Sequence, residues 1–198
     1  MSFIRTIVAT AMLMAAVSVP AFQQAHAQNS TIMVIDDNRI FLDSKAGKDI
    51  QTKLQNIEKQ ISNELEPTRK SLESEAKALQ PKLQGKTREA IAADTALVNE
   101  LSAFQKKNNE LGQKSAIAER EYAMTAEKAI IDFNKALDPV LTEVIREKNA
   151  QIVLLKSQVV FSADTVDATA AIVQKLDART AAIAVTRQKL PTAPQGAN

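Results

Sequence analysis

The sequence predicts a mainly α-helical protein with a small β part. A long antiparallel helical hairpin, a coiled-coil-like arm, projects from a hub of short strands that oligomerisation completes. Three observations predict this fold class. Apolar residues recur at steps of three and four through two long segments, and short β-prone runs flank those segments. Aromatic residues are only 4% of the chain and there are 4 glycines in 198 residues, which favours thin helical seams over a deep core.

Residues 1–27 read as a cleavable export signal. Arg5 supplies a positive start, residues 7–19 form an apolar run, and Ala25-His26-Ala27 fits the small-x-small cleavage rule. We expect cleavage after Ala27, with an uncleaved anchor as the alternative. The apolar run is shorter than the roughly 20 residues of a membrane span. The expected destination lies beyond the inner membrane of a bacterium, and stability there must come without disulfides because the chain has no cysteine.

The predicted hub combines residues 28–43 with residues 149–178. Residues 31–36 (TIMVID) form a short strand, and Asp36 and Asp37 then open a helical turn. Residues 152–155 and 159–161 are two more apolar runs, which predict a hairpin, and Asp167 is positioned to cap a last helix. Three short strands make a poor sheet alone, so copies from other chains are expected to complete it. The hub residues are Ile32, Val34, Ile152, Val153, Leu154, Val159, Val160 and Phe161.

Residues 44–148 are the predicted arm. The first helix begins after Asp43 or Ser44, and the chain reverses at about 85–94, where Gly85 can end one helix and Thr87 or Asp94 can cap the next. Each helix of about 40 residues would reach roughly 60 Å. The seam of the second helix is expected along Leu97, Leu101, Phe104, Asn108, Leu111, Ser115, Ala118, Tyr122, Thr125 and Ala129.

Prolines and the C-terminal segment complete the organisation. Pro67 and Pro81 should kink the first helix or end a sub-helix, and Asp138-Pro139 should break the second, which restarts at residues 140–148. Residues 179–198 form a tail that we expect to be disordered at its end, from Leu190 onward.

The residue types exclude most catalytic chemistry. His26, in the signal, is the one histidine, and there is no cysteine or tryptophan. Thiol nucleophiles, histidine triads and His/Cys zinc sites are therefore excluded from the mature chain. Asp36 and Asp37 are a weak metal candidate, since adjacent strand residues point opposite ways, and helix capping is the better interpretation. We predict no enzyme, no cofactor, no metal and no catalytic residue.

Two exposed surfaces are candidates for binding. Ile117 and Met124 lie off the main seam of the second helix and are predicted to face a client or a cavity, with packing inside the hairpin as the alternative. The hairpin tip carries Lys77, Lys82, Lys86 and Arg88 against Glu89 within residues 76–93. This basic tip either meets anionic membrane headgroups or is an ordinary solvated face. The near-balanced charge, 25 basic against 23 acidic residues, argues against nucleic-acid binding.

The chain resembles the Skp (OmpH-like) family of periplasmic chaperones. The resemblance lies in TIMVIDDNRIFLDSKAGKDIQ, the charged helical hairpin, LDPVLTEVIREKNAQIVLLKSQVVF and DATAAIVQKLDA, and it covers roughly residues 31–178. It implies a periplasmic homotrimer whose strands form a shared hub. The arms would surround a cavity that holds unfolded outer-membrane β-barrel proteins. Lys156-Ser157 departs from the acidic residue expected after the strand, and no lipopolysaccharide-binding site can be matched.

The predicted function is therefore that of an ATP-independent holding chaperone of the periplasm. The alternative is a structural or adaptor coiled-coil protein of the cell envelope, built to span distance rather than to enclose clients. A chaperone would keep a diluted, denatured β-barrel protein soluble, whereas a spacer would not.

Overall fold

A computed structural model describes residues 31–190 of the chain. The predicted signal peptide, its cleavage site after Ala27 and the end of the tail, residues 191–198, lie outside the described residues. Within residues 31–190, no helix is both long enough and apolar enough to cross a membrane.

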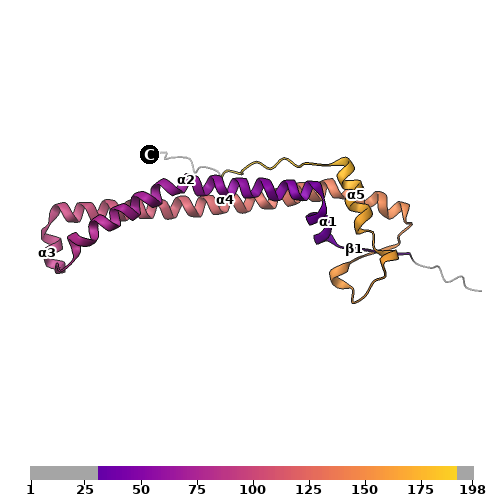
Figure 1. Ribbon diagram of the computed structural model, residues 1–198, viewed down its shortest axis with the longest axis horizontal. Coiled ribbons are helices and arrows are strands. Elements are labelled where there is room, and N and C mark those ends of the chain that lie inside the picture. The colour runs from indigo at the N-terminus through magenta and orange to yellow at the C-terminus, as the bar shows by residue number, and fades with distance from the viewer. Residues whose placement is uncertain (1–30, 191–198) are drawn as a thin grey trace, which may run out of the picture.

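The fold is a long two-helix arm on a small mixed hub (Figure 1). In order, the elements are β1 (Ile32–Ile35), α1 (Asp37–Asp43), α2 (Lys45–Leu83), α3 (Arg88–Ala93), α4 (Thr95–Glu147), β2 (Ile152–Leu155), the 3-10 turns η1 (Lys156–Gln158) and η2 (Asp164–Val166), and α5 (Thr169–Arg179). The predicted fold class, mainly helical with a small β part, is confirmed.

The sheet differs from the predicted one. β1 and β2 pair with each other in parallel, with Ile32 opposite Ile152. The expected hairpin between β2 and residues 159–161 is wrong, and so is the expectation that the strands lack partners in their own chain. The reason is local: the chain leaves the sheet in the 3-10 turn directly after β2, where the ammonium group of Lys156 is held 2.8 Å from Asp167.

The core lies at the hub end of the arm. It joins β1 and α1 to the first turns of α2, the last third of α4 and α5, and Phe41 meets Phe133 edge-on with ring centroids 5.0 Å apart. Its buried apolar residues are Met33, Ile35, Ile40, Ala46, Ile50, Ala129, Phe133, Val140, Val144, Ala168, Ile172, Leu176 and Ile183. Farther along the arm the buried apolar residues between the helices thin to Ile57, Leu65, Leu72, Leu79, Leu97 and Ala118.

Side-chain caps begin the helices where the sequence places them. Asp36 accepts the Arg39 N–H at the start of α1, which confirms the predicted helix cap. Ser44 caps α2 by accepting the Gly47 N–H. Thr87 and Asp94 cap α3 and α4, so the reversal of the arm consists of a turn with Gly85 at a φ of 76° followed by one short helix.

The prolines do not break the helices of the arm. α2 continues through Pro67 and Pro81, and α4 continues through Pro139, so the predicted break and restart at Pro139 is wrong. All three prolines are exposed, and water can therefore satisfy the carbonyls that lose their intrahelical partners. Figure 1 shows a hairpin that bows along its length.

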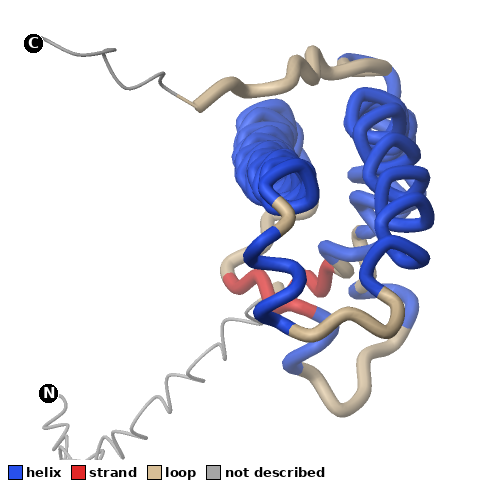
Figure 2. The backbone as a smooth tube through the Cα atoms, turned by 90° about the vertical axis from the view of Figure 1, so that its left-hand side faces the viewer, coloured by secondary structure: helices blue, strands red, loops and turns tan. Residues whose placement is uncertain are grey.

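The segment after α5 returns along the arm. Residues 180–190 run as an extended strap over the side of the hairpin opposite the sheet, as Figures 1 and 2 show from two directions. Ile183 is buried in the core cluster, and Arg187 reaches both α2 and α4. The sequence indicated only an ambiguous tail here, whereas this part of it is docked.

Candidate functional site

An exposed apolar stripe follows one face of α4. Ile117 and Met124, the two residues predicted to face a client, are both exposed, and so is Ile131. These residues follow one another at intervals of seven positions, which is close to two helical turns, so all three lie on one face of the helix. Sequence reasoning missed Ile131, although the seven-residue spacing could have found it. We call Ile117, Met124 and Ile131 the arm stripe.

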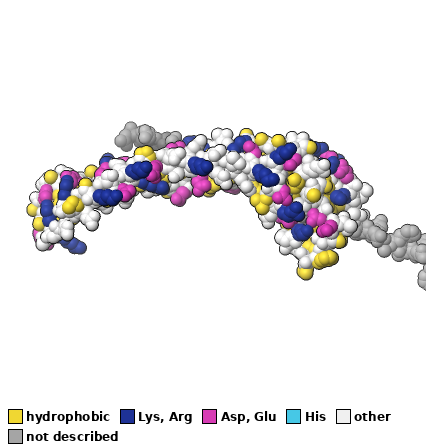
Figure 3. Space-filling model, viewed as in Figure 1, with side chains coloured by type: hydrophobic (Ala, Val, Ile, Leu, Met, Phe, Trp, Pro, Cys, Tyr) yellow, Lys and Arg dark blue, Asp and Glu magenta, His cyan; other side chains and the backbone are white. Residues whose placement is uncertain are grey.

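A second apolar surface lies on the hub. Ile32 and Ile152, which are opposite each other in the sheet, are both exposed. In the loop after β2, Val160 is 107% exposed and Phe161 is 82% exposed. Figure 3 shows apolar side chains gathered at the foot of the hub, where Figure 1 places this loop. We call these four residues the hub patch.

The remaining predicted hub residues have other surroundings. Val34 is buried within its own chain, where its carbonyl accepts the Ala168 N–H. Val153, Leu154 and Val159 are half-buried. The structure therefore brings only part of the predicted set to the surface.

The basic tip is largely paired within the arm. Lys82 contacts Glu100 at 2.6 Å, Lys86 contacts Asp94 at 2.9 Å, and Lys77 contacts Glu73 at 2.6 Å. Of the four basic residues predicted there, only Arg88 has no carboxylate partner among the described residues. This pairing weakens the attraction expected for anionic headgroups, and a membrane-binding tip stays a proposal.

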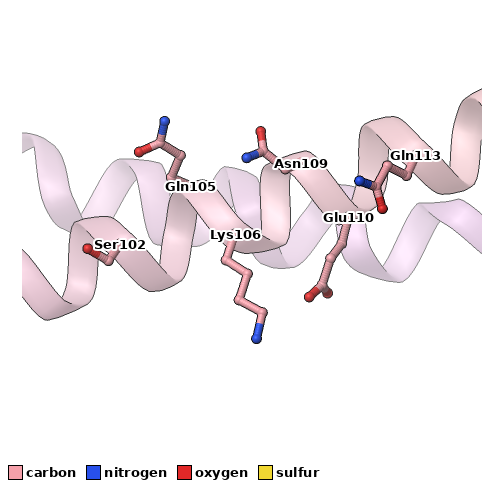
Figure 4. Close-up of a pocket in the computed structure, with 6 residues that line it drawn as sticks. All are labelled: Ser102, Gln105, Lys106, Asn109, Glu110 and Gln113. Atoms are coloured by element: carbon pink, nitrogen blue, oxygen red, sulfur yellow. The ribbon is translucent and has the colours of Figure 1, made fainter. Parts of the chain in front are cut away.

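Depressions on the arm do not resemble a catalytic site. One of about 450 Å³ lies on the outer face of α4, where polar side chains from a single helix point in different directions (Figure 4). Another, of about 280 Å³, lies between α2 and α4 beside Ile61, Ala118 and Tyr122. Residues 31–190 contain no group of three or more His, Cys, Asp or Glu side chains that could hold a metal.

A buried carboxylate sits beneath the strap. Glu121 of α4 is only 5% exposed. Its Oε2 lies 2.9 Å from Nε of Arg187 and 3.2 Å from Nζ of Lys189, and its Oε1 accepts the Leu190 N–H. Burial opposes ionisation, but the Leu190 N–H, Lys189 and Arg187 outweigh it and lower the pKa of Glu121. The carboxylate is therefore charged at neutral pH.

Lys156, the basic residue that stands after β2 where the family resemblance led us to expect an acidic one, also has a partner in the structure. Lys156 pairs with Asp167, which in addition accepts the Thr169 N–H at the start of α5. The hydrogen bond from Lys156 and those from Thr169 lower the pKa of Asp167 to about 2. A basic residue after β2 thus joins the sheet to the last helix.

Comparison with known proteins decides the family. The model of the outer membrane protein (OmpH-like) family matches residues 31–176, which is most of the chain. The chain belongs to the OmpH-like family. A crystal structure of a protein proposed to be an OmpH-like outer membrane chaperone from Caulobacter crescentus is similar, at 25% identity and a TM-score of 0.69. The match covers 81% of this chain and 92% of that chain. No curated protein matches the chain.

Family and fold together support a chaperone role. The OmpH-like chaperone family is non-enzymatic and implies a periplasmic location. The family match ends at residue 176, so the strap lies beyond it.

Proposed function

We propose that the chain is an ATP-independent holding chaperone that binds unfolded outer-membrane β-barrel proteins in the periplasm and prevents their aggregation. The observation that carries this proposal is the arm stripe, an exposed apolar row on a long arm. Exposed apolar rows of this kind suit contact with unfolded polypeptide, whose apolar side chains are not yet buried. Family membership supports the same class of function.

The hub patch supports assembly of the chain with itself. Four large apolar side chains at one end of the molecule are costly to leave in water and suit an interface between copies. We infer a homotrimer, in which three hubs meet and three arms surround a cavity. In such an assembly each client segment would meet several arm stripes at once, which raises the effective affinity of weak apolar contacts.

Aggregation of a client on dilution tests the proposal. A urea-denatured outer-membrane β-barrel protein is diluted into buffer, and turbidity is followed with and without the chain. We expect the wild type to keep the client soluble in a fixed ratio. A spacer or adaptor protein, the alternative function, would leave turbidity unchanged.

A matched pair of variants tests the arm stripe. Changing Ile117 and Met124 to Lys should weaken protection, because it places charge in the proposed contact surface. Changing the polar residues Asn109 and Gln113 of the same helix to Lys adds the same charge elsewhere and should leave protection unchanged. Equal protection of the client by the two variants would show that the arm stripe is not the client-binding surface.

A further inference from the structure

Part of the hold on the strap comes through its backbone. The Ile183 N–H donates to Asp49 at 3.0 Å, and Nζ of Lys53 donates to the Ile183 carbonyl at 2.7 Å. Farther along, the Gln188 N–H donates to Oγ1 of Thr125 at 2.9 Å and the Leu190 N–H to Oε1 of Glu121 at 3.3 Å. Side chains of two helices thus satisfy the main chain of a segment that belongs to no sheet.

Such contacts tolerate many sequences. A side chain can bind the backbone N–H or carbonyl of almost any residue, the exception being proline, which has no N–H to donate. Backbone hydrogen bonds therefore give affinity, while side-chain pockets set the preference, as in other recognition of extended peptides. The groove between α2 and α4 on this side has the chemistry of a peptide-binding site.

Two side chains of the strap supply the preference. Ile183 is buried against the core, and Arg187 follows four residues later with a side chain only 13% exposed. The guanidinium group spans the hairpin, with Nη1 2.8 Å from Glu64 of α2 and Nε 2.9 Å from Glu121 of α4. The groove therefore favours an apolar residue followed, four positions on, by an arginine.

We propose that this groove is a binding site for extended polypeptide, that residues 180–190 are its resident occupant, and that unfolded chains with the same apolar-then-arginine spacing compete for it. The competition by clients rests on the proposed function, whereas the site itself does not. A tethered occupant is present at an effective concentration on the order of millimolar, so weak segments are excluded and only well-matched or abundant ones enter.

A labelled peptide tests the site on the full chain. The peptide has the sequence of residues 180–190, TAAIAVTRQKL, and carries fluorescein. Fluorescence anisotropy measures its binding to the wild type and to a variant with Ile183→Asp and Arg187→Gln. The two changes remove the side-chain contacts of Ile183 and Arg187 and so release the strap from the groove; we call this the unseated variant. We expect binding to the unseated variant and at least about tenfold weaker binding to the wild type.

Matched controls assign the binding to the groove. The same peptide with its Ile and Arg exchanged has the same composition and should not bind. Adding Glu121→Gln to the unseated variant should weaken binding by about tenfold or more, because it removes the negative charge that pairs with the arginine of the peptide. An unseated variant that keeps the wild-type circular dichroism spectrum and does not bind the peptide would overturn the proposal.

Hydrogen exchange gives a second test that needs no variant. In the wild type, an excess of the peptide should speed exchange of the Ile183, Gln188 and Leu190 amides, and the Ile/Arg-exchanged peptide should not. Unchanged exchange at saturating peptide would also overturn the proposal. Neither readout involves aggregation of a client, so failure of this site and failure of the holding function are distinguishable.

Discussion

At the scale of single residues, Gly47 decides how the arm joins the hub. It lies in the first turn of α2, where a Cβ atom would stand 1.8 Å from the carbonyl oxygen of Phe41. That oxygen is main chain at the end of α1, so it cannot move aside without shifting the α1–α2 junction. Glycine is required here by close approach and not by a positive φ, because Gly47 lies within the regular helix α2.

We expect Gly47→Ala to destabilise the protein by about 1–3 kcal/mol or more, as overpacking of a tight contact does. Gly112→Ala is the matched control, because a Cβ there meets nothing within 4 Å. In mid-helix it should stabilise by about 0.5–1 kcal/mol. Urea unfolding followed by circular dichroism measures both, and equal effects of the two changes would contradict the close packing at Gly47.

Asp167 predicts a loss of stability in acid. Its folded pKa is about 2, against 3.8 ordinarily, and at 1.36 kcal/mol per pKa unit the difference corresponds to about 2 kcal/mol. Because the folded pKa is the lower one, this stabilisation is present above pH 4 and is lost as the pH falls through 4 towards 2. The free energy of unfolding of Asp167→Asn should lie below that of the wild type at pH 7 and converge with it near pH 2. If the free energies of unfolding of the two proteins differed by the same amount at every pH from 7 to 2, the pairing of Asp167 with Lys156 would be contradicted.

At the scale of elements, burial is uneven along the arm. The core cluster contains four buried residues of α4, Ala129, Phe133, Val140 and Val144, whereas residues 100–116 of the same helix have no buried side chain. Asn108, predicted in the seam, is exposed, and Ser115 is half-buried. The strap ties α2 to α4 at Glu64 and Glu121, which lies on the hub side of this region. Local opening should therefore be confined mainly to the distal arm.

Hydrogen exchange of the wild type checks this gradient. Amides of residues 100–116 should exchange much faster than those of residues 129–144, and the distal amides should slow when a denatured β-barrel protein is bound. Both regions lie in one continuous helix, so the comparison is made within a single element. Equal protection along α4 would show that the arm opens as a unit.

The parts of the fold that repeat locally could be predicted from the sequence. Capping by Asp36, Ser44, Thr87 and Asp94, together with the two long helices, depends on spacings of three and four residues, which a sequence displays directly. The sheet could not be predicted in the same way. Whether β2 pairs with β1 or with residues 159–161 depends on where the arm returns the chain and on the Lys156–Asp167 pair, which a short apolar run does not reveal.

The strap was missed for a related reason. Its anchors join residues distant in sequence, such as Glu64 with Arg187, and an extended segment has no helical period to detect. Alanine-rich composition made residues 180–190 resemble a tail. Two residues of the arm stripe, Ile117 and Met124, could be predicted because they lie off the seam. Ile131 follows other apolar residues directly, so its position on the exposed face is not evident from the sequence.

At the scale of the whole molecule, the hub patch predicts self-association. Ile152→Asp and Phe161→Asp should each place an unpaired charge in the interface, at a cost of several kcal/mol. Multi-angle light scattering should give a trimer for the wild type and a monomer for both variants, with unchanged circular dichroism. Asn134→Asp, an exposed change on α4 away from the patch, should remain trimeric. A wild type that is a stable monomer at micromolar concentration would remove the homotrimer from the account.

Arms around a shared cavity imply a defined complex with a client. The chain and a denatured outer-membrane β-barrel protein are mixed by dilution, separated by size exclusion and weighed by light scattering. We predict one soluble species whose mass equals three copies of the chain and one client. A client that precipitates or elutes apart from the chain would contradict the holding function.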